Sequence, residues 1–445
     1  MKITLFLVFV VLALTMFTGC GRENTPGGYE NESQPPDIAS VEYLPDTGLA
    51  EIEPAGTGVL PSIFIGLPAR NLDRNEWRGT TVSVRDGGEY SFVPVVARVR
   101  GRGNSTWRYM GEKRPLRIRF SEARPMLGSS YAATDWNLIN NASDYSLVRS
   151  YAAYYLGYLL RGRGFGPAHH LVHVYMDGDY RGVYLLTQQN QVHEGRVELA
   201  YNSNPALSEY FLQWCRHRRS EGDVYFHVGE GRTPFELRYP SGRRLTAEHT
   251  AFAQYFINQV DAAMISMNYE AITALIDVPS FVDFYLVNEF FKNVDVGFSS
   301  AFFQIRQTDT GPRLFAGPLW DFDQSSGSSY VSGWYTDYSP QRLWVVHANH
   351  WLRNFIVIPE LRDSVAKRWH EIRDNEIAAM IHHLEDISIR YRACFDRNFQ
   401  RWPNKLGNYL WRTPRTIMAI DTHEGQMAHL VDWFRQRAAW FDEFF

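Results

Sequence analysis

Alternating apolar and polar residues predict a series of strands between residues 60 and 120. Ser62–Leu67, Thr80–Val84 and Tyr90–Arg100 are rich in Val, Ile, Phe and Tyr and are bounded by Gly or Asp, as strands commonly are. Leu116–Phe120 alternates apolar and basic residues, which is the period of a strand with one buried face. We therefore expect the globular part of the chain to open with β-structure.

A helix and a β-hairpin are predicted next. Asp144 can cap a helix over Tyr145–Leu160, where apolar residues recur at helical spacing. His170–Met176 and Tyr180–Thr187 flank the sequence Asp177-Gly178-Asp179. Asp-Gly between two alternating apolar runs is a strong hairpin signal.

Beyond Ala247 the pattern is mainly helical. The predicted helices are Glu248–Met267, Val278–Asn293 with Pro279 in its first turn, Pro359–Arg373 and Gln426–Phe441. A strand-like pair, Phe302–Arg306 and Arg313–Phe315, interrupts them. A mostly β N-terminal part followed by a helical C-terminal part, without regular βαβ alternation, predicts an α+β fold.

The N-terminus reads as a lipoprotein signal peptide. Lys2 precedes an apolar run from Leu5 to Thr18, which is too short to span a bilayer and fits a signal-peptide core. The small Gly19 stands directly before Cys20, as lipoprotein signal peptidase requires. We expect cleavage after residue 19 and lipidation of Cys20, which would anchor the protein to a bacterial membrane on its extracytoplasmic side. An uncleaved anchor or a plain secretory signal, with Cys20 incidental, is the alternative.

Composition divides the rest of the chain into two parts. Residues 20–58 are rich in Pro, Gly, Asn, Ser and Glu, which predicts a flexible tether. Residues 59–445 form the predicted globular domain. A hydrophobic fraction of 45% and an aromatic fraction of 15% exclude wholesale disorder. The net charge of −4 argues against a protein that binds nucleic acid mainly by electrostatic attraction, because such binding needs a basic face.

The small numbers of Cys and Lys residues bear on which kinds of site the chain can contain. After cleavage, Cys215 and Cys394 are the only cysteines with free thiols, and they can either pair or stay reduced. Neither lies in a CxxC motif, so a zinc site is not expected. Lys and Arg total 45, of which only five are Lys. A position that keeps Lys in such an Arg-rich chain can need the compact charge of an ammonium group rather than the planar guanidinium of Arg.

Two basic segments are candidates for binding an anion. Arg100–Trp107 (RGRGNSTW) combines glycines with a Ser-Thr pair, which permits close backbone approach to an anion, although an ordinary β-turn explains it too. Lys113 and Arg114 follow it, and Arg117 and Arg119 share one face of the next strand. A solvated basic edge that protects the sheet is the alternative for these residues.

Three carboxylates are candidates for binding a cation. Asp295 falls where the helix over Val278–Asn293 ends, so a loop can direct it. Asp321 and Asp323 are two residues apart after an apolar run and would share one face of a strand. Paired carboxylates suit a hard cation, whereas turn-forming Asp near a strand end is the alternative. Together, the basic strand and the acids are the two halves of a nucleotide–metal site.

Five sequence segments, in this order, resemble the CotH-type (spore coat protein H) kinase family. They are RVRGRGNSTW…EKRPLRIRF, WNLINNASDYSLVRSYAAYYLG, VYMDGDYRGVYLLTQQ, YLVNEFFKNVDVGF and PLWDFDQSSG. The resemblance covers about residues 60–440. It implies an atypical protein-kinase-like fold around a nucleotide cleft, and phosphorylation of Ser or Thr with ATP and Mg²⁺ or Mn²⁺.

The resemblance also implies roles for individual residues. Asp295 resembles the catalytic aspartate and Asp321 the metal ligand, with Asp323 beside it, whereas Asp144 and Arg149 match an internal structural pair. The segment around Gly103, Asn104 and Ser105 resembles the nucleotide-side loop, and Lys113 and Arg114 resemble the basic pair that faces the phosphates, with either of the two as the contact. Arg102 and Arg117 are the further nucleotide-binding candidates. This interpretation requires that the cations near residue 113 and the acids at 295 and 321 line opposite walls of one cleft.

Two positions depart from the family pattern. Gln188 stands where the family usually has a carboxylate, and Ser300 stands where it commonly has Asn about five residues after the catalytic aspartate. Both changes weaken a polyphosphate site. The alternative interpretation is therefore a catalytically weak or inactive kinase-like scaffold lipoprotein that binds a protein or glycan at the cell envelope. Metal-dependent phosphoester hydrolysis is a third possibility, and no His cluster accompanies the acids to favour it.

Overall fold

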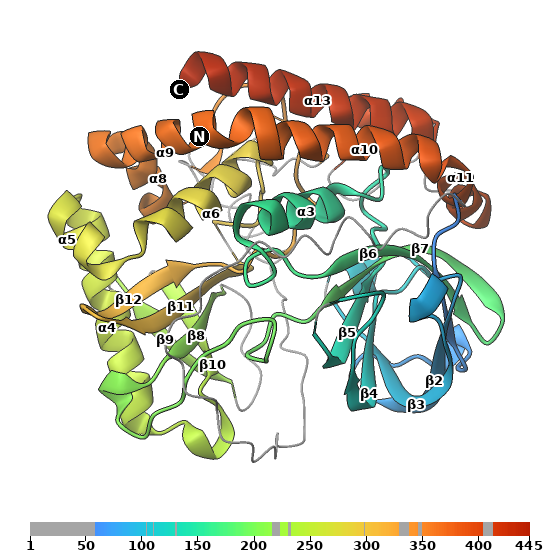
Figure 1. The fold of residues 1–445 in the computed structure, drawn as a ribbon, viewed down its shortest axis with the longest axis horizontal. Helices are drawn as coiled ribbons and strands as arrows, with labels where there is room; N and C mark the ends of the chain where they lie inside the picture. The colour runs from blue at the N-terminus through green and yellow to red at the C-terminus, as the bar shows by residue number, and fades with distance from the viewer. Residues whose placement is uncertain are drawn as a thin grey trace, which may run out of the picture.

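The computed structural model describes residues 58–445 with short gaps (Figure 1). The residues left out within this range are 104, 110, 130, 216–222, 230–232, 298, 329–337, 346–348 and 404–412. The predicted signal peptide, Cys20 and the tether up to residue 57 lie outside the described residues. Within the described part, no helix is both long enough and apolar enough to cross a bilayer.

The N-terminal strands close into a seven-stranded barrel in the order β1-β2-β3-β4-β5-β7-β6. The strands are β1 Ser62–Ile65, β2 Arg78–Arg85, β3 Phe92–Gly101, β4 Leu116–Arg124, β5 Ala133–Ile139, β6 His169–Met176 and β7 Asp179–Gln188. Parallel pairing of β1 with β6 closes the barrel, and the other neighbours are antiparallel. Alternate side chains such as Val99, Ile118, Trp136 and Leu186 fill its core.

A second, antiparallel sheet has the order β12-β11-β8-β10-β9. Its strands are β8 Tyr210–Trp214, β9 Val224–Val228, β10 Thr233–Tyr239, β11 Ala301–Thr308 and β12 Gly311–Ala316. Helices α4 and α6 contact this sheet at β9 and β12. A large aromatic core, which includes Trp214, Phe235, Phe303 and Trp351, joins the sheet to the helices.

A layer of helices that includes α3, α6, α9, α10 and α13 covers the two β-units from one side, and α4 lies along the second sheet (Figure 1). The helices are α2 Ser105–Tyr109, α3 Arg149–Arg161, α4 Ala247–Ser266, α5 Tyr269–Leu275, α6 Val278–Phe290, α8 His350–Val357, α9 Pro359–Ile372, α10 Ala378–Arg390, α11 Arg392–Arg401, α12 Arg415–Met418 and α13 His423–Phe444. A π-helical turn, Arg373–Ile377, joins α9 to α10. α3 contacts β6 of the barrel as well as α6 and α10, so it connects the barrel to the helical layer.

The structure confirms the predicted α+β composition and most of the predicted elements. The hairpin at Asp177-Gly178 forms with positive φ at both residues, as a two-residue turn between twisted strands requires. The sequence did not predict β5, β8, β9 and β10. Cys215 and Cys394 are both buried and do not form a disulfide with each other.

The predicted start of the helix after Asp144 is wrong. α3 begins at Arg149, because Leu147 adopts a left-handed φ of 67° and interrupts the helical path. Asp144 instead accepts hydrogen bonds from the backbone N–H of Ser146 (2.9 Å) and of Arg149 (2.9 Å). The carboxylate therefore organises the loop before the helix and still binds the first helical N–H.

The predicted internal pair of Asp144 and Arg149 is confirmed as a buried ion pair. Both side chains are almost fully buried, and the Arg149 Nε donates to the carbonyl of Ser325 (3.1 Å). Because burial removes both charges from water, each depends on the other for compensation. The pair thereby connects α3 to the loop that follows Asp323.

We expect Arg149→Leu to lower the free energy of unfolding by about 3–5 kcal/mol, because it leaves the Asp144 carboxylate buried without a counter-charge. Urea unfolding monitored by tryptophan fluorescence measures this change. Arg435→Ala is the matched control: it breaks a solvent-exposed ion pair with Glu385 and should cost less than about 1 kcal/mol. Equal losses in the two variants would contradict the structural role of Arg149.

Candidate functional site

Two loops from different parts of the chain are hydrogen-bonded to each other beside the C-terminal end of α6. The Val294 N–H donates to the carbonyl of Gln324 (3.3 Å), and the Ser326 N–H donates to the carbonyl of Phe291 (2.6 Å). α6 is buried along nearly its whole length. Packing in the core therefore fixes the position of its C-terminal end, from which the chain continues to Asp295. These contacts bring Asp295 next to the sequence Trp320-Asp321-Phe322-Asp323.

The carboxylates of Asp295, Asp321 and Asp323 form one cluster. Each offers an oxygen, and these oxygens all lie within 4.8 Å of one another. Asp323 is buried, whereas Asp295 and Asp321 are half-buried. Two hydroxyls orient the group: Ser143 Oγ donates to Asp323 (2.7 Å), and Ser300 Oγ donates to Asp321 (2.9 Å).

The prediction that Asp321 and Asp323 lie on a strand is wrong. Residues 317–328 have no regular secondary structure, and Asp321 has a left-handed φ of 68°. Its backbone N–H donates to the Tyr154 hydroxyl (3.4 Å), and Tyr154 stacks on Trp320 at 5.9 Å. The backbone conformation and these contacts, rather than the two-residue strand period, bring the two carboxylates together.

Asp323 has a perturbed acidity. Burial raises the pKa of the Asp323 carboxyl to about 7, and the negative charge of Asp321 adds to the effect. The hydrogen bond from Ser143 and the positive charge of Arg102 act in the opposite direction. A buried carboxyl beside a second acid favours its neutral form unless a cation is present.

The cluster suits a divalent cation of the hard, oxygen-binding type. Three carboxylates from two loops supply oxygen donors at one point, which is the donor chemistry that Mg²⁺ and Mn²⁺ prefer. Two of the three side chains are accessible enough to admit other ligands such as a phosphate. The residues present therefore fit the metal that the sequence predicted.

Arg102 is the predicted nucleotide-binding residue that the structure brings toward the acids. Its guanidinium lies over the Trp320 ring at 5.7 Å, and its charge acts on Asp323. Gly103 has a positive φ of 76°, and a Cβ added there would lie 2.4 Å from the Thr106 hydroxyl, so this turn requires glycine. Ser105 begins α2, and Asn104 lies outside the described residues.

Lys113 and Arg114 have partners away from the carboxylates. Lys113 is buried, donates to Asn398 of α11 (2.9 Å) and lies over the Tyr184 ring at 5.2 Å. Arg114 lies over the Trp107 ring at 4.7 Å and lines a cavity of about 570 Å³ at the end of the barrel. Their contact with a phosphate stays a prediction.

Arg117 belongs to a row of polar side chains on the outer face of the barrel, which the sequence did not predict as a unit. The register aligns Arg100 with Arg117, Arg117 with Asn137, and Asn137 with Thr187 across four strands. Arg117 pairs with Asp135 (2.9 Å). Among the described residues, the buried Asn137 Oδ1 and Thr187 Oγ1 have no hydrogen-bond partner. The alternation of apolar and basic residues along β4 could have predicted this row, because it places Arg117 on the face of the strand that points away from the core residues Leu116 and Ile118.

The two departures from the family pattern have different surroundings. Ser300 adopts a left-handed φ of 59°, a conformation in which Asn is enriched, and it still supplies a hydroxyl to Asp321. Gln188 is buried at the end of β7, opposite Trp136 of β5. Ser300 therefore replaces an amide within the acidic cluster, whereas Gln188 belongs to the barrel.

A protein-family model described as CotH kinase protein matches residues 99–441 of the chain. The match covers more than three quarters of the sequence and includes Arg102 and the three clustered carboxylates. No curated protein matches the chain.

The acidity of Asp323 predicts a pH-dependent affinity for Mn²⁺. Below pH 7 the cation must displace a proton from Asp323, so its affinity should fall by up to about tenfold per pH unit. Isothermal titration with Mn²⁺ between pH 5.5 and 8.5 measures this slope, and Asp323→Asn is the control that should bind weakly at every pH. A pH-independent affinity would contradict the role of Asp323.

The same pKa predicts how the metal-free protein responds to pH. The folded state binds the Asp323 proton more tightly than the unfolded chain does, so stability is lost as pH rises from about the ordinary value of 3.8 to about 7. Asp323→Asn should reduce this loss in urea unfolding, since an amide does not ionise.

Proposed function

The chain belongs to the CotH kinase family, and we propose that it transfers the γ-phosphoryl group of ATP to a Ser or Thr hydroxyl of an extracytoplasmic protein. The observation that carries the proposal is the convergence of Asp295, Asp321 and Asp323, whose oxygens lie within 4.8 Å of one another. Phosphoryl transfer depends mainly on positioning and electrostatics, and this cluster supplies both.

Asp295 is the proposed catalytic base. Its half-buried carboxylate follows α6 directly and lies at the accessible side of the cluster, where an incoming hydroxyl can approach. The carboxylate accepts the hydroxyl proton as the new oxygen–phosphorus bond forms and the bond between the β-phosphate oxygen and the γ-phosphorus breaks. ADP then leaves with the electron pair of that bond.

Asp321 and Asp323 are the proposed ligands of Mg²⁺ or Mn²⁺. When bound, such an ion neutralises phosphate charge and aligns the transferred group. The Ser143 and Ser300 hydroxyls hold the two carboxylates in fixed orientations, which reduces the reorganisation that binding requires. Arg102 lies beside them over Trp320 and contributes positive charge on the side from which a triphosphate enters.

A kinase-like division of the fold supports this proposal. The barrel supplies Arg102 and the polar row that includes Arg117 and Asn137, and the helical part supplies the acids. We propose that the nucleotide binds between these parts, with Gly103, Asn104 and Ser105 near its phosphates. Lys113 and Arg114 act from the barrel side, where Lys113 joins the segment before β4 to Asn398 of α11.

A scaffold without turnover is the second candidate function, and the contacts of the basic residues favour it. Lys113 is committed to Asn398 and Arg117 to Asp135, so two of the proposed phosphate-binding cations already have protein partners. Ser300 and Gln188 replace groups that the family commonly uses. Such a scaffold would bind a protein or glycan at the cell envelope without hydrolysing ATP.

Label transfer from γ-³²P-ATP in the presence of Mn²⁺ distinguishes the two functions. We expect Asp295→Ala and Asp321→Ala each to lower the rate at least about a hundredfold, because they remove the base and a metal ligand. Asp309→Ala is the control, since Asp309 is an exposed acid in the β11–β12 turn. Wild-type rates in both active-site variants would contradict the assignment, and no transfer by the wild type would favour the scaffold.

The proposed location rests on Cys20. If the chain is a lipoprotein, Cys20 carries the lipid, and cells that express Cys20→Ser should neither incorporate labelled palmitate into the protein nor retain it in the membrane fraction. Cys394→Ala is the control, because Cys394 is buried in the folded domain and should leave labelling unchanged. Lipid incorporation that persists in Cys20→Ser would contradict the anchor.

A further inference from the structure

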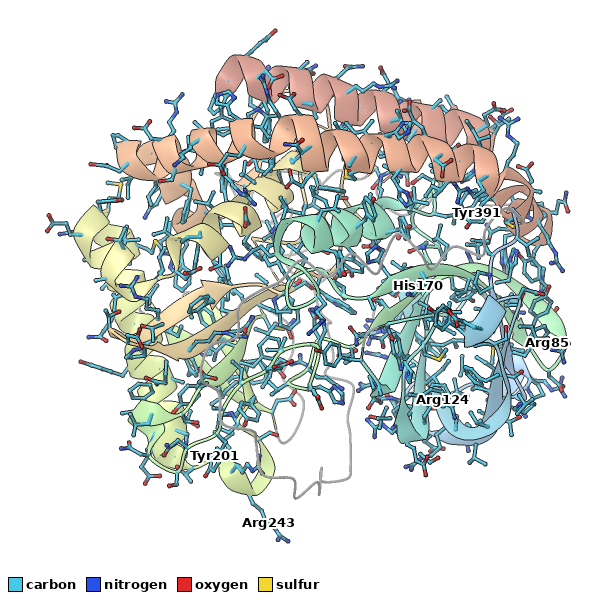
Figure 2. All side chains as sticks on the ribbon, in the orientation of Figure 1. Arg85, Arg124, His170, Tyr201, Arg243 and Tyr391 are labelled. Carbon is cyan, nitrogen blue, oxygen red and sulfur yellow. The ribbon has the colours of Figure 1, made fainter. Side chains whose placement is uncertain are left out.

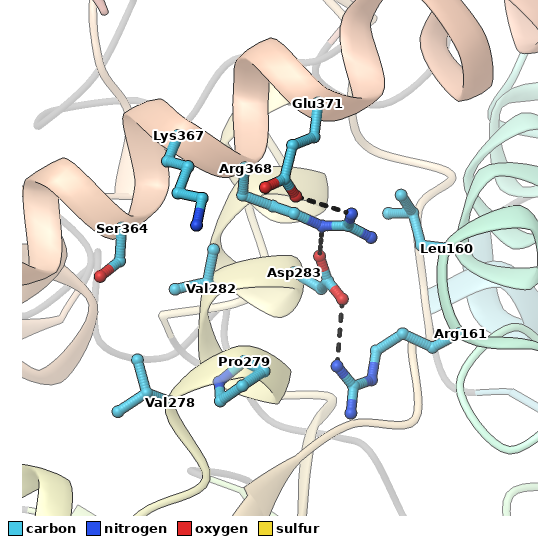
Figure 3. A pocket seen from close by; sticks show the side chains of 10 residues that line it. All are labelled: Leu160, Arg161, Val278, Pro279, Val282, Asp283, Ser364, Lys367, Arg368 and Glu371. Carbon is cyan, nitrogen blue, oxygen red and sulfur yellow. Dashed lines mark hydrogen bonds and ion pairs between the residues drawn. The ribbon is translucent and has the colours of Figure 1, made fainter. Parts of the chain in front are cut away.

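A cavity of about 540 Å³ lies at the opposite end of α6 from the carboxylate cluster. Its walls are the last turn of α3, the first turns of α6 and part of α9 (Figure 3). The apolar part of the lining comes from Leu160, Val278, Pro279 and Val282. This volume falls within the range of about 300–1,000 Å³ that is typical of small-molecule sites.

An ion-pair network around the buried Asp283 forms the polar wall of the cavity. The Asp283 side chain is only 4% exposed and pairs with Arg368 (2.8 Å) and Arg161 (3.1 Å). Arg368 also pairs with Glu371 (3.2 Å), and Arg161 lies 3.8 Å from Asp277. Arg368 uses Nε and Nη1 in these pairs, so the remaining Nη2 donors of its fixed guanidinium are available to a ligand.

Lys367 is the cation of this cavity that the network does not neutralise. Its side chain extends from α9 toward Val282 (Figure 3), and no acidic residue in the described part of the chain pairs with it. The chain has five Lys among 45 basic residues. Of the three in the described residues, Lys113 and Lys292 are buried and hydrogen-bonded, whereas Lys367 is exposed at the cavity.

We propose that this cavity binds a small organic acid, with a single carboxylate on an apolar ring or chain. The carboxylate pairs with Lys367 and accepts from Arg368, and the apolar body contacts Val278, Pro279 and Val282. The residues that line the cavity carry three positive charges, on Arg161, Lys367 and Arg368, against two negative charges, on Asp283 and Glu371. One negative charge on the ligand therefore balances the lining, whereas a second would be repelled by the two acids.

Phenylacetate is a suitable probe, with benzyl alcohol as its uncharged counterpart and phenyl phosphate as a dianion. Ligand-observed NMR titration of the purified protein should give a Kd of about 1 mM or tighter for phenylacetate, and weaker binding of the other two. Lys367→Ala should weaken phenylacetate binding about tenfold, and Lys367→Glu should abolish it. Lys367→Arg should retain it.

Arg243→Glu is the matched control, because Arg243 is an exposed cation that projects from the far end of the molecule (Figure 2). It should leave binding unchanged. Asp321→Ala should also leave phenylacetate binding unchanged, because the cavity is separate from the proposed kinase site. Failure of the kinase proposal therefore does not affect the proposal of an organic-acid site, and the reverse also holds. Equal binding of the acid and the alcohol, unchanged binding in Lys367→Glu, or no binding up to about 10 mM would overturn the proposal.

Discussion

Three carboxyl groups, each with an oxygen within 4.8 Å of the others, are the central constraint on this structure. Like charges at this distance repel, and burial of Asp323 adds a desolvation cost that raises its pKa to about 7. The cluster persists because the surrounding protein fixes it: Ser143 and Ser300 donate to two of the carboxylates, and two backbone hydrogen bonds join their loops. A site that is costly to assemble in this way is commonly functional.

The rest of the fold holds these loops in place. α6 is buried along almost its full length and ends shortly before Asp295, so its packing in the core positions this residue. Arg149, at the start of α3, pairs with Asp144 and donates to the Ser325 carbonyl, so the helix that connects barrel and helical layer also fixes the second acidic loop. The β3–β4 connection of the barrel contributes Arg102, whose charge partly offsets that of Asp323. The acidic cluster therefore depends on all parts of the domain.

The sequence allowed the local features to be predicted because short-range chemistry determines them. The hairpin at Asp177-Gly178 and the end of α6 before Asp295 follow from turn residues and apolar spacing. The acidic cluster could be predicted from residue types and family resemblance, although the strand expected at Asp321 is a loop with a left-handed residue.

Long-range contacts could not be predicted in the same way. Lys113 hydrogen-bonds to Asn398, which lies 285 residues later in the chain, and no local pattern encodes such a partner. Closure of the barrel depends on parallel pairing of β1 with β6, which alternation within each strand does not specify. The network around Asp283 joins three helices and becomes visible only when those helices are packed.

The most direct test of the central claim is an anomalous-scattering map of crystals grown with Mn²⁺ and a non-hydrolysable ATP analogue. We predict a manganese peak bound by oxygens of Asp321 and Asp323 and next to Asp295, with triphosphate density beside it on the Arg102 side. Manganese and nucleotide bound elsewhere in the molecule, with the three carboxylates unliganded, would contradict it.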